Sequence, residues 1–299
     1  ASDVYKRQVA DIAELLERRG DTVQVLERSS LEATRLDAAR GLLSGGLHPE
    51  EVGRIALRMR ADVVHAHNVH PLFGWLALAA ARADGARTVL HLHNFRLFCA
   101  IAVAYRDGAP CFRCRGRNTW PGLRLRCRGS LPEAAVYATG LHRQQPRLFE
   151  HADRFVVVAR AHGERLRELG LPREKTSTLP NFLPSRQFAA ASQAHAGGYA
   201  LLSGHLVPEK GYDTAILAAR EAGVPLRIAG EGPDGRRLLA LAEGADIRFL
   251  GLLSPERLAE ERRGAAIVLV PSRCEEACPY AVLDAFAAGT PVLVSDRGG

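Results

Sequence analysis

The chain has 299 residues, 47% of them hydrophobic and 24% charged, which is enough for two soluble domains with separate cores. No apolar run reaches the roughly 18 residues of a spanning helix, and no secretory signal layout begins the chain. We therefore expect a cytoplasmic protein, with peripheral contact at the inner face of the membrane left open. The net charge of +7 suits phosphorylated ligands or anionic lipid. Without a basic–aromatic motif beside it, nucleic acid is not an expected partner.

Both ends of the sequence suggest a fragment. The stretch "DVYKRQ" near the start resembles translated sequencing-adapter DNA, so residues 1–8 are set aside as adapter-derived. A helix at 9–20 then opens the recognisable pattern, with no strand before it, and the last residues stop just after a strand. We expect both domains to be incomplete.

Short apolar runs alternate with helical stretches along the first half. Predicted strands lie at 22–26, 62–67, 88–93 and 154–159, with helical patterns such as 73–83 and 134–149 between them. Near-continuous apolar strands separated by helices are typical of parallel sheets covered on both faces.

The Ala-, Ser- and Gly-rich stretch at 183–198 reads as a linker, after which the alternation restarts with "YALLSG", "LRIAG", "IRFLG", "AIVLVPS" and "PVLVSD". The sequence therefore predicts an α/β protein with two doubly wound, Rossmann-like domains facing across a cleft, at 9–185 and 196–299. In such sheets ligands bind at the carboxyl ends of strands.

Two loops of the second domain carry phosphate-binding features. In "SGHLVPEKG", Lys210 stands just before a helix, where its charge would add to unpaired backbone N–H groups. In "IAGEGP", Gly230 and Gly232 would let the backbone approach a ligand. Each feature alone also fits a simpler role, a surface lysine and a tight turn.

The stretch "CEEACPYAVLDAFAAG" places two acids around a helix start. Pro279 suits the first turn of this helix, and Gly289 suits its C-terminal cap. The helix N-terminus, which lies between the two acids, suits an anion. Carboxylates would repel a phosphate there, so Glu276 and Asp284 should accept hydrogen bonds from hydroxyls flanking it. A nucleotide-sugar has this composition. The simpler alternative is that Glu276 caps the helix and Asp284 is solvated.

The order of these loops resembles family 4 of the GT-B glycosyltransferases. "SGHLVPEKG", "LRIAGEGP", "IRFLG" and "PSRCEEACPYAVLDAFAAGTPVLVSDRGG" follow the family's order over 199–299, including an acid separated by seven residues from a second acid. In the first half, "DVVHAHN", "TVLHLHN" and "LPNF" are also similar.

The resemblance implies roles for individual residues. Glu276 would contact the donor sugar, backbone amides of 278–281 would cradle the diphosphate, Asp284 would hold the ribose, and Lys210 would neutralise the leaving group. His93 would lie near the transferred sugar, and Asn181 near the hinge. The implied donor-binding residues are Gly204, His205, Lys210, Gly232, Cys278, Pro279, Tyr280, Ala281 and Asp284, with His93 and Glu276 catalytic. His205 replaces the family's usual Arg, and Asp284 its usual Glu.

The implied function is retaining transfer of a hexosyl-type sugar from a nucleotide-diphosphate sugar, UDP- or GDP-linked, to a glycan or lipid-linked acceptor in bacterial cell-envelope polysaccharide or glycoconjugate synthesis. No cofactor is implied for the transfer. The alternatives are a GT-B nucleotide-sugar 2-epimerase and a non-catalytic sugar-nucleotide-binding pseudoenzyme.

Six cysteines and a group of histidines remain. Cys99, Cys111, Cys114 and Cys127 fall in an insertion at about 99–130 on the acceptor side, spaced C-x11-C-x2-C-x12-C, which suits structural zinc, reduced thiols, disulfides or an iron–sulfur centre. Arg113, Arg115 and Arg117 there either meet an acidic acceptor or are solvated. His65, His67, His70, His91 and His93 favour packing over a metal site.

Overall fold

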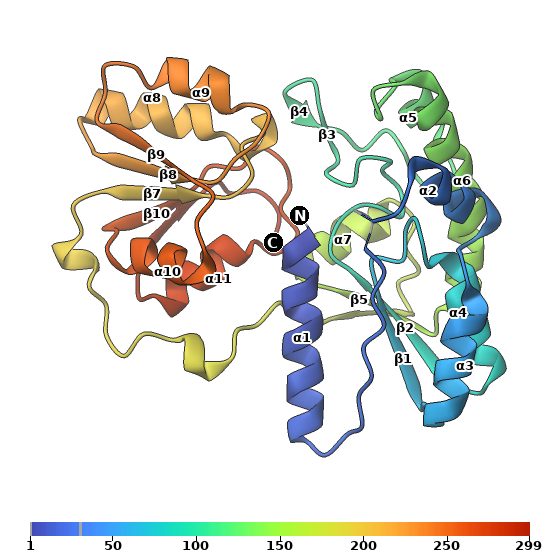
Figure 1. Cartoon of the computed structure of the whole chain (residues 1–299). Coiled ribbons are helices and arrows are strands. Elements are labelled where there is room, and N and C mark those ends of the chain that lie inside the picture. Colours follow the sequence, from blue (N-terminus) through green and yellow to red (C-terminus); the bar gives the residue numbers. More distant parts are fainter. Residues whose placement is uncertain (1, 30–31) are drawn as a thin grey trace. The chain divides into compact units, whose positions relative to one another are not determined.

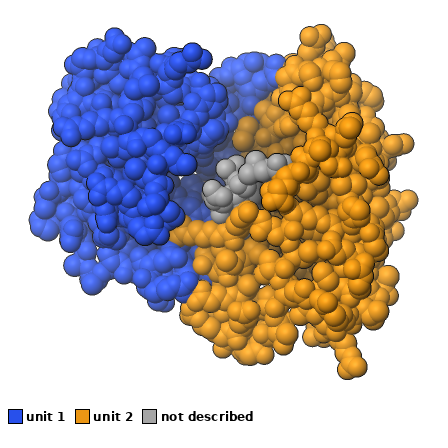
Figure 2. Space-filling model, in the orientation of Figure 1, with its two compact units in different colours: residues 1–4, 105–110, 181–298 blue, residues 5–104, 111–180, 299 orange. Residues whose placement is uncertain are grey.

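The computed structural model describes residues 2–29 and 32–299, which form two compact units (Figure 2). The N-terminal unit holds residues 5–104 and 111–180. The C-terminal unit holds residues 181–298 together with the hairpin at 105–110. Figure 1 labels the helices and strands of both units.

The N-terminal unit is built on a parallel sheet of four strands in the order β1-β2-β5-β6. The strands are β1 (Val63–His67), β2 (Arg87–Leu92), β5 (Arg154–Val157) and β6 (Thr176–Thr178). The helices are α1 (Ser2–Arg18), α2 (Arg35–Ser44), α3 (Pro49–Met59), α4 (Gly74–Ala83), α5 (Trp120–Arg124), α6 (Leu131–His151) and α7 (Arg160–Glu168). Three of the four strands predicted from the first half are therefore confirmed.

The prediction of a strand at 22–26 is wrong. The segment is extended, but it belongs to no sheet among the described residues, and Val25 is 53% exposed. A strand needs a neighbour to pair its backbone N–H and C=O groups. Among the described residues, β1 pairs only with β2, so the segment contributes only Leu26 to a small cluster around α3 and α4.

The sequence explains where helix α6 of this unit begins. Ser130 caps α6 by accepting a hydrogen bond from the N–H of Glu133, and Pro132 in the first turn removes a donor that would otherwise be unsatisfied. Helix α1 begins at Ser2, so it includes the segment set aside as adapter sequence. The main core gathers residues such as Leu90, Leu148 and Phe155 from β2, α6 and β5.

The C-terminal unit has a parallel sheet of five strands in the order β11-β10-β7-β8-β9. The strands are β7 (Ala200–Ser203), β8 (Leu226–Ala229), β9 (Ile247–Gly251), β10 (Ile267–Val270) and β11 (Val292–Val294), with the hairpin strands β3 (Tyr105–Arg106) and β4 (Ala109–Pro110) apart from them. The helices are α8 (Tyr212–Ala222), α9 (Gly235–Leu241), α10 (Pro255–Arg263) and α11 (Tyr280–Ala287), with short 3-10 turns η1 (Ser185–Gln187), η2 (Ala194–Ala196) and η3 (Pro208–Lys210). All five strands predicted for the second half are confirmed.

Helices cover both faces of this sheet, α8 and α9 on one side and α10 and α11 on the other (Figure 1). Alternation along β7 explains the two cores, because Leu202 packs with α8 and α9 while Leu201 packs with Ala285 of α11. Within the described part of the chain, no helix combines the length and the apolar character needed to cross a bilayer.

Candidate functional site

Strand order in the C-terminal unit brings two predicted loops together. Strands β7 and β10 are neighbours, so the loops at 204–211 and 271–279 both leave the carboxyl edge of the sheet. The carbonyl of Glu209 accepts hydrogen bonds from the N–H of Arg273 at 2.8 Å and of Cys274 at 3.3 Å. Gly211, with φ +67°, permits this approach, because a Cβ there would lie 2.1 Å from the carbonyl oxygen of Pro271.

Lys210 and Glu276 form an ion pair across these loops. The hydroxyl of Ser272 donates a second hydrogen bond to the same carboxylate oxygen at 2.6 Å. Burial alone would lower the pKa of Lys210, but the carboxylate of Glu276 outweighs it and the pKa lies above its usual value. Two residues 66 positions apart in the chain therefore form one charged site, and Lys210 is not an isolated surface lysine.

Glu276 does not cap helix α11. The residue at the N-cap position is Pro279, which makes no side-chain cap hydrogen bond. The expected cradle of amides from 278–281 needs one correction, since proline has no N–H and only Cys278, Tyr280 and Ala281 can donate. The loop is held from behind by Asn181, whose Nδ2 donates to the carbonyl of Cys278 at 2.9 Å. An uncapped helix start with a positive dipole end suits an anion.

Asp284 is not a solvated residue of α11. Its carboxylate lies 3.2 Å from the guanidinium of Arg262 on α10, and the two side chains are only 11% and 13% exposed. A ligand hydroxyl that donates to Asp284 would therefore bind a carboxylate that is already paired with Arg262.

The loops after β7 and β8 pack backbone against backbone. A Cβ on Gly230 would lie 1.9 Å from the carbonyl oxygen of Gly204, and one on Gly232 would lie 2.3 Å from that of Leu206. Both glycines are thus required by loop packing, whatever else they contact. The Nδ1 of His205 lies 2.8 Å from the carbonyl oxygen of Glu231, which only accepts, so Nδ1 carries the proton.

We expect Gly230→Ala to destabilise the C-terminal unit by about 2–3 kcal/mol, because its φ of +135° is accessible essentially to glycine and the new Cβ would overlap backbone. Gly223→Ala is the control, since φ is +63° there and a Cβ would meet nothing within 4 Å, so only the backbone term of about 1 kcal/mol applies. Denaturant unfolding measures both. Equal losses would contradict the packing argument.

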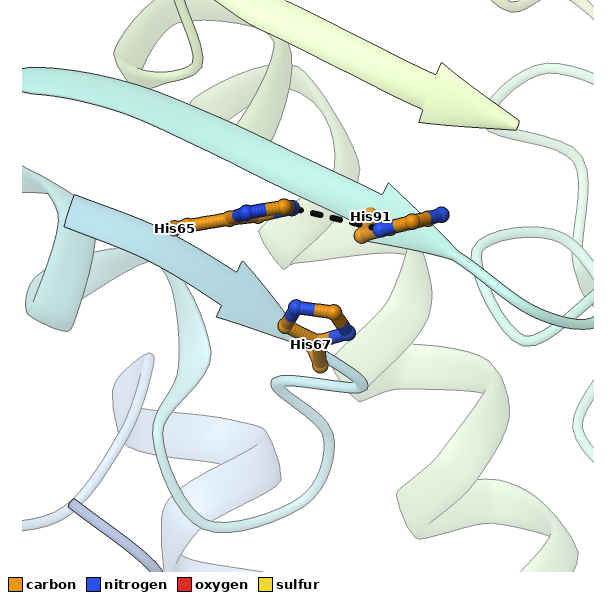
Figure 3. A group of neighbouring side chains, drawn as sticks. All are labelled: His65, His67 and His91. Atoms are coloured by element: carbon orange, nitrogen blue, oxygen red, sulfur yellow. Dashed lines mark hydrogen bonds between the residues drawn. The ribbon is translucent and has the colours of Figure 1, made fainter. Parts of the chain in front are cut away.

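The predicted histidines of the N-terminal unit do gather. Ligand nitrogens of His65, His67 and His91 all lie within 4.8 Å of one another at the ends of β1 and β2 (Figure 3). The rings also hydrogen-bond in pairs, His65 Nε2 to His91 Nδ1 at 3.2 Å and His67 Nδ1 to His93 Nε2 at 2.9 Å. The spacing would admit a metal ion, but the paired rings already give a packing explanation.

Burial keeps these imidazoles neutral. It is the main cause that lowers the pKa of His91 and of His93 to about 2, and neighbouring histidines add to it. His93 and His91 also line a small pocket of about 20 Å³, together with Asn94 and Arg96. His93 therefore borders a small cavity at the carboxyl end of β2.

The four insertion cysteines all lie in the N-terminal unit, and none of the chain's six cysteines forms a disulfide. Of the neighbouring arginines, Arg115 donates to the carbonyl of Glu168 at 3.0 Å, and Arg117 lies 3.2 Å from His142. These two side chains are tied to nearby helices although they remain exposed.

Sequence reasoning missed several residues of the site. Ser272 follows β10 directly, which was a usable signal. Tyr212 is buried beside Glu276, and burial together with that charge raises the pKa of its hydroxyl. Arg262 and Arg273 had no local signal, since their partners Asp284 and Asp213 lie on other helices.

Comparison with known proteins agrees with this architecture. Residues 6–186 match the model of Glycosyltransferase Family 4, and residues 187–299 match that of Glycosyl transferases group 1. A D-inositol 3-phosphate glycosyltransferase of Rhodococcus erythropolis is 31% identical over 95% of this chain and 69% of its own length. The share of a curated relative's length that the chain spans ranges from 16% to 70%.

Solved structures share the fold at low identity. Sucrose-phosphate synthase from Thermosynechococcus elongatus aligns with a TM-score of 0.66 at 18% identity, covering 100% of this chain and 76% of its own. Anabaena HepE, solved with UDP and glucose, aligns with a TM-score of 0.57 at 15% identity, covering 96% of this chain and 70% of its own. The chain belongs to glycosyltransferase family 4 and has the GT-B fold.

Proposed function

We propose that this protein transfers a hexosyl-type sugar from a nucleotide-diphosphate sugar to a glycan or lipid-linked acceptor, with retention of anomeric configuration, in cell-envelope polysaccharide or glycoconjugate synthesis. The observation that carries the proposal is the Lys210–Glu276 pair beside the uncapped N-terminus of α11. It combines a cation and the backbone amides of the helix start, which suit phosphate, with a carboxylate, which suits hydroxyls.

In this proposal the amides of Cys278, Tyr280 and Ala281 bind the donor diphosphate. Lys210 turns from Glu276 toward it and stabilises the negative charge that develops as the phosphate leaves. Glu276 then accepts hydrogen bonds from sugar hydroxyls, while Ser272 holds its carboxylate in place. Asp284, oriented by Arg262, accepts from the ribose. The site supplies its own positive charge, so we propose that transfer itself uses no metal.

A double displacement would need a carboxylate nucleophile on the opposite face of the sugar, and we identify no candidate for it. We therefore propose a same-face displacement in which the leaving phosphate takes the acceptor proton. His93 would border the transferred sugar as a neutral hydrogen-bonding group, because burial holds its pKa far below 7.

The names of the relatives guide the choice of donors and acceptors to test. HepE binds UDP according to its structure, which favours a UDP-sugar, with a GDP-sugar as the next choice. The name of the Rhodococcus enzyme makes D-inositol 3-phosphate a useful member of any acceptor panel. The absence of disulfides among the six cysteines is in keeping with a cytoplasmic site of action, and we propose the inner face of the membrane for lipid-linked acceptors.

Thermal shift with UDP, GDP, ADP, TDP and their common sugars tests the donor site. A ligand at about 100 times its Kd adds about 2.7 kcal/mol of stability, which raises Tm by roughly 5–10 °C. We expect a shift for one base, lost in Lys210→Ala and kept in Lys175→Ala. Lys175 is the matched control because its ammonium is engaged elsewhere, by carbonyls of Phe149 and Ala152.

Product analysis then separates the alternatives. Transfer to an acceptor supports the proposal, and turnover of the nucleotide-sugar without an acceptor indicates a 2-epimerase. Binding without any turnover indicates a pseudoenzyme. No shift with any nucleotide, from protein that unfolds cooperatively, would contradict the donor site itself.

A further inference from the structure

The insertion at 99–130 has an unusual backbone for a segment with so little regular structure. Four of the described non-glycine residues with positive φ fall inside it, Ala102 (+69°), Ala104 (+47°), Asp107 (+51°) and Arg126 (+48°). Such conformations are unfavourable for residues with a Cβ and persist only where the surroundings hold them. Its regular elements are two-residue strands and the five-residue helix α5, so something other than secondary structure must fix the loops.

The first of these left-handed turns wraps around Cys99. Burial raises the pKa of the Cys99 thiol, while hydrogen bonds from the backbone N–H groups of Ile101, Ala104 and Ala102 act in the opposite direction. The N–H of Ala102 also donates to the carbonyl oxygen of Cys99 at 3.0 Å, so this turn closes back on the cysteine. Amides directed at sulfur stabilise a thiolate, and supporting hydrogen bonds of this kind orient the ligands of metal sites.

Cys114 lies at the centre of the group. Burial and the proximity of Cys99, Cys127 and Cys111 raise the pKa of its thiol to about 11. The thiol lies 3.9 Å from the carbonyl oxygen of Thr119, which also accepts from the N–H of Gly122 at 3.0 Å. A Cβ on Gly122 would lie 3.8 Å from the Cys114 sulfur and 3.8 Å from the Cβ of Ala100, the neighbour of Cys99. The carbonyl of Gly122 accepts from the N–H of Cys127 at 3.0 Å. Gly122 thus connects three of the four cysteines.

Cys111 is linked to the turn after Cys99, because its N–H donates to the carbonyl of Ala104 at 2.7 Å. The turn after Cys114 is also tight, with a bridge between Arg115 and Asn118 and a φ of +49° at Gly116. Cys127 follows directly on the left-handed Arg126. Each cysteine therefore lies next to a turn or a backbone hydrogen bond that fixes its backbone position.

We propose that Cys99, Cys111, Cys114 and Cys127 bind one Zn²⁺ ion as four thiolates and that this structural site folds the insertion. Four sulfur ligands in a tetrahedron are a standard closed zinc site, and the four protons leave to solvent as the ion binds. Among the described residues only the histidine group has all its ligand atoms within 4.8 Å of one another. Side-chain rotations must therefore bring the four sulfurs onto the ion.

Metal content of the full chain tests this proposal. We expect about one zinc per chain after purification, and a Co²⁺-substituted protein with the intense thiolate-to-metal absorption of a tetrahedral sulfur site. Cys99→Ser and Cys114→Ser should lose the metal. Cys278→Ser, the matched control in the C-terminal unit, should keep it. Chelation should lower Tm in the parent protein and in Cys278→Ser, but not in Cys114→Ser.

Three results would overturn the proposal. The first is folded parent protein without stoichiometric zinc, even after refolding with added Zn²⁺. The second is metal that stays in Cys114→Ser and is lost in His91→Asn, which would assign it to the histidine group. The third is a disulfide between any two of the four cysteines. The Co²⁺ spectrum of the parent protein decides the ligand type even if the serine variants fail to fold.

Discussion

Glu276→Ala is expected to lower kcat/KM for sugar transfer about 10²–10³-fold, the loss typical of removing one well-placed electrostatic group. The variant loses the acceptor for donor-sugar hydroxyls. It also removes the ion-pair partner of Lys210, so the ammonium is no longer held in the position that it has without ligand. The measurement is initial-rate kinetics with the donor identified by thermal shift.

Two further variants identify the cause of the loss. Glu276→Gln keeps the shape and one carbonyl acceptor, so it should recover part of the rate if hydrogen bonding matters more than charge. Glu275→Ala is the matched control, an adjacent acid to which we assign no role, and its rate should stay within a few-fold of the parent. If Glu276→Ala transferred sugar at the parent rate, the site assignment would be wrong.

The fold was largely accessible from sequence because buried parallel strands are continuous apolar runs. The runs at 62–67 and 267–270 needed no knowledge of their partners to be recognised. The segment at 22–26 has the same apolar character and is not a strand, since strand formation depends on a neighbour that a local pattern does not specify.

The site was accessible only in part. Parallel topology indicated that Lys210 and Glu276 lie at one edge of the sheet, but their direct ion pair depends on Gly211 allowing close approach to Pro271. The partner of Asp284 could not be predicted, because Arg262 reaches it from another helix. The roles of Gly230 and Gly232 in loop packing likewise required the backbone path of the neighbouring loop.

We expect His70 and His91 alone to cost the N-terminal unit about 4 kcal/mol of stability between pH 7 and pH 5, because each contributes a slope of about 1.4 kcal/mol per pH unit below pH 6.5. Burial lowers the pKa of His70 to about 3 and that of His91 to about 2, against an ordinary 6.5. Below pH 6.5 the histidines of the unfolded chain become protonated, whereas the buried imidazoles of the folded protein stay neutral. The stability that these neutral histidines contribute is therefore fully present above pH 6.5. It is lost progressively as the pH falls toward the lowered pKa values of the folded state.

Denaturant unfolding at pH 7.5, 6.5, 5.5 and 5.0 measures this slope. His91→Asn should reduce the slope of stability against pH by the equivalent of about one proton. The control is His195→Asn, which replaces an exposed histidine of the C-terminal unit. The groups around His91 are mostly other histidines, His65, His93 and His162, so few carboxylates compete in this pH range.

Carboxylates titrate in a different window. Burial raises the pKa of Asp153, but hydrogen bonds from Thr88 and Arg82 lower it overall, so its contribution is lost only from its ordinary value of 3.8 downward. A fall in stability that begins between pH 6 and 7 must therefore come from histidine. Unchanged stability down to pH 5 would mean that the folded histidines accept protons, and the neutral role given to His93 beside the sugar would fail with it.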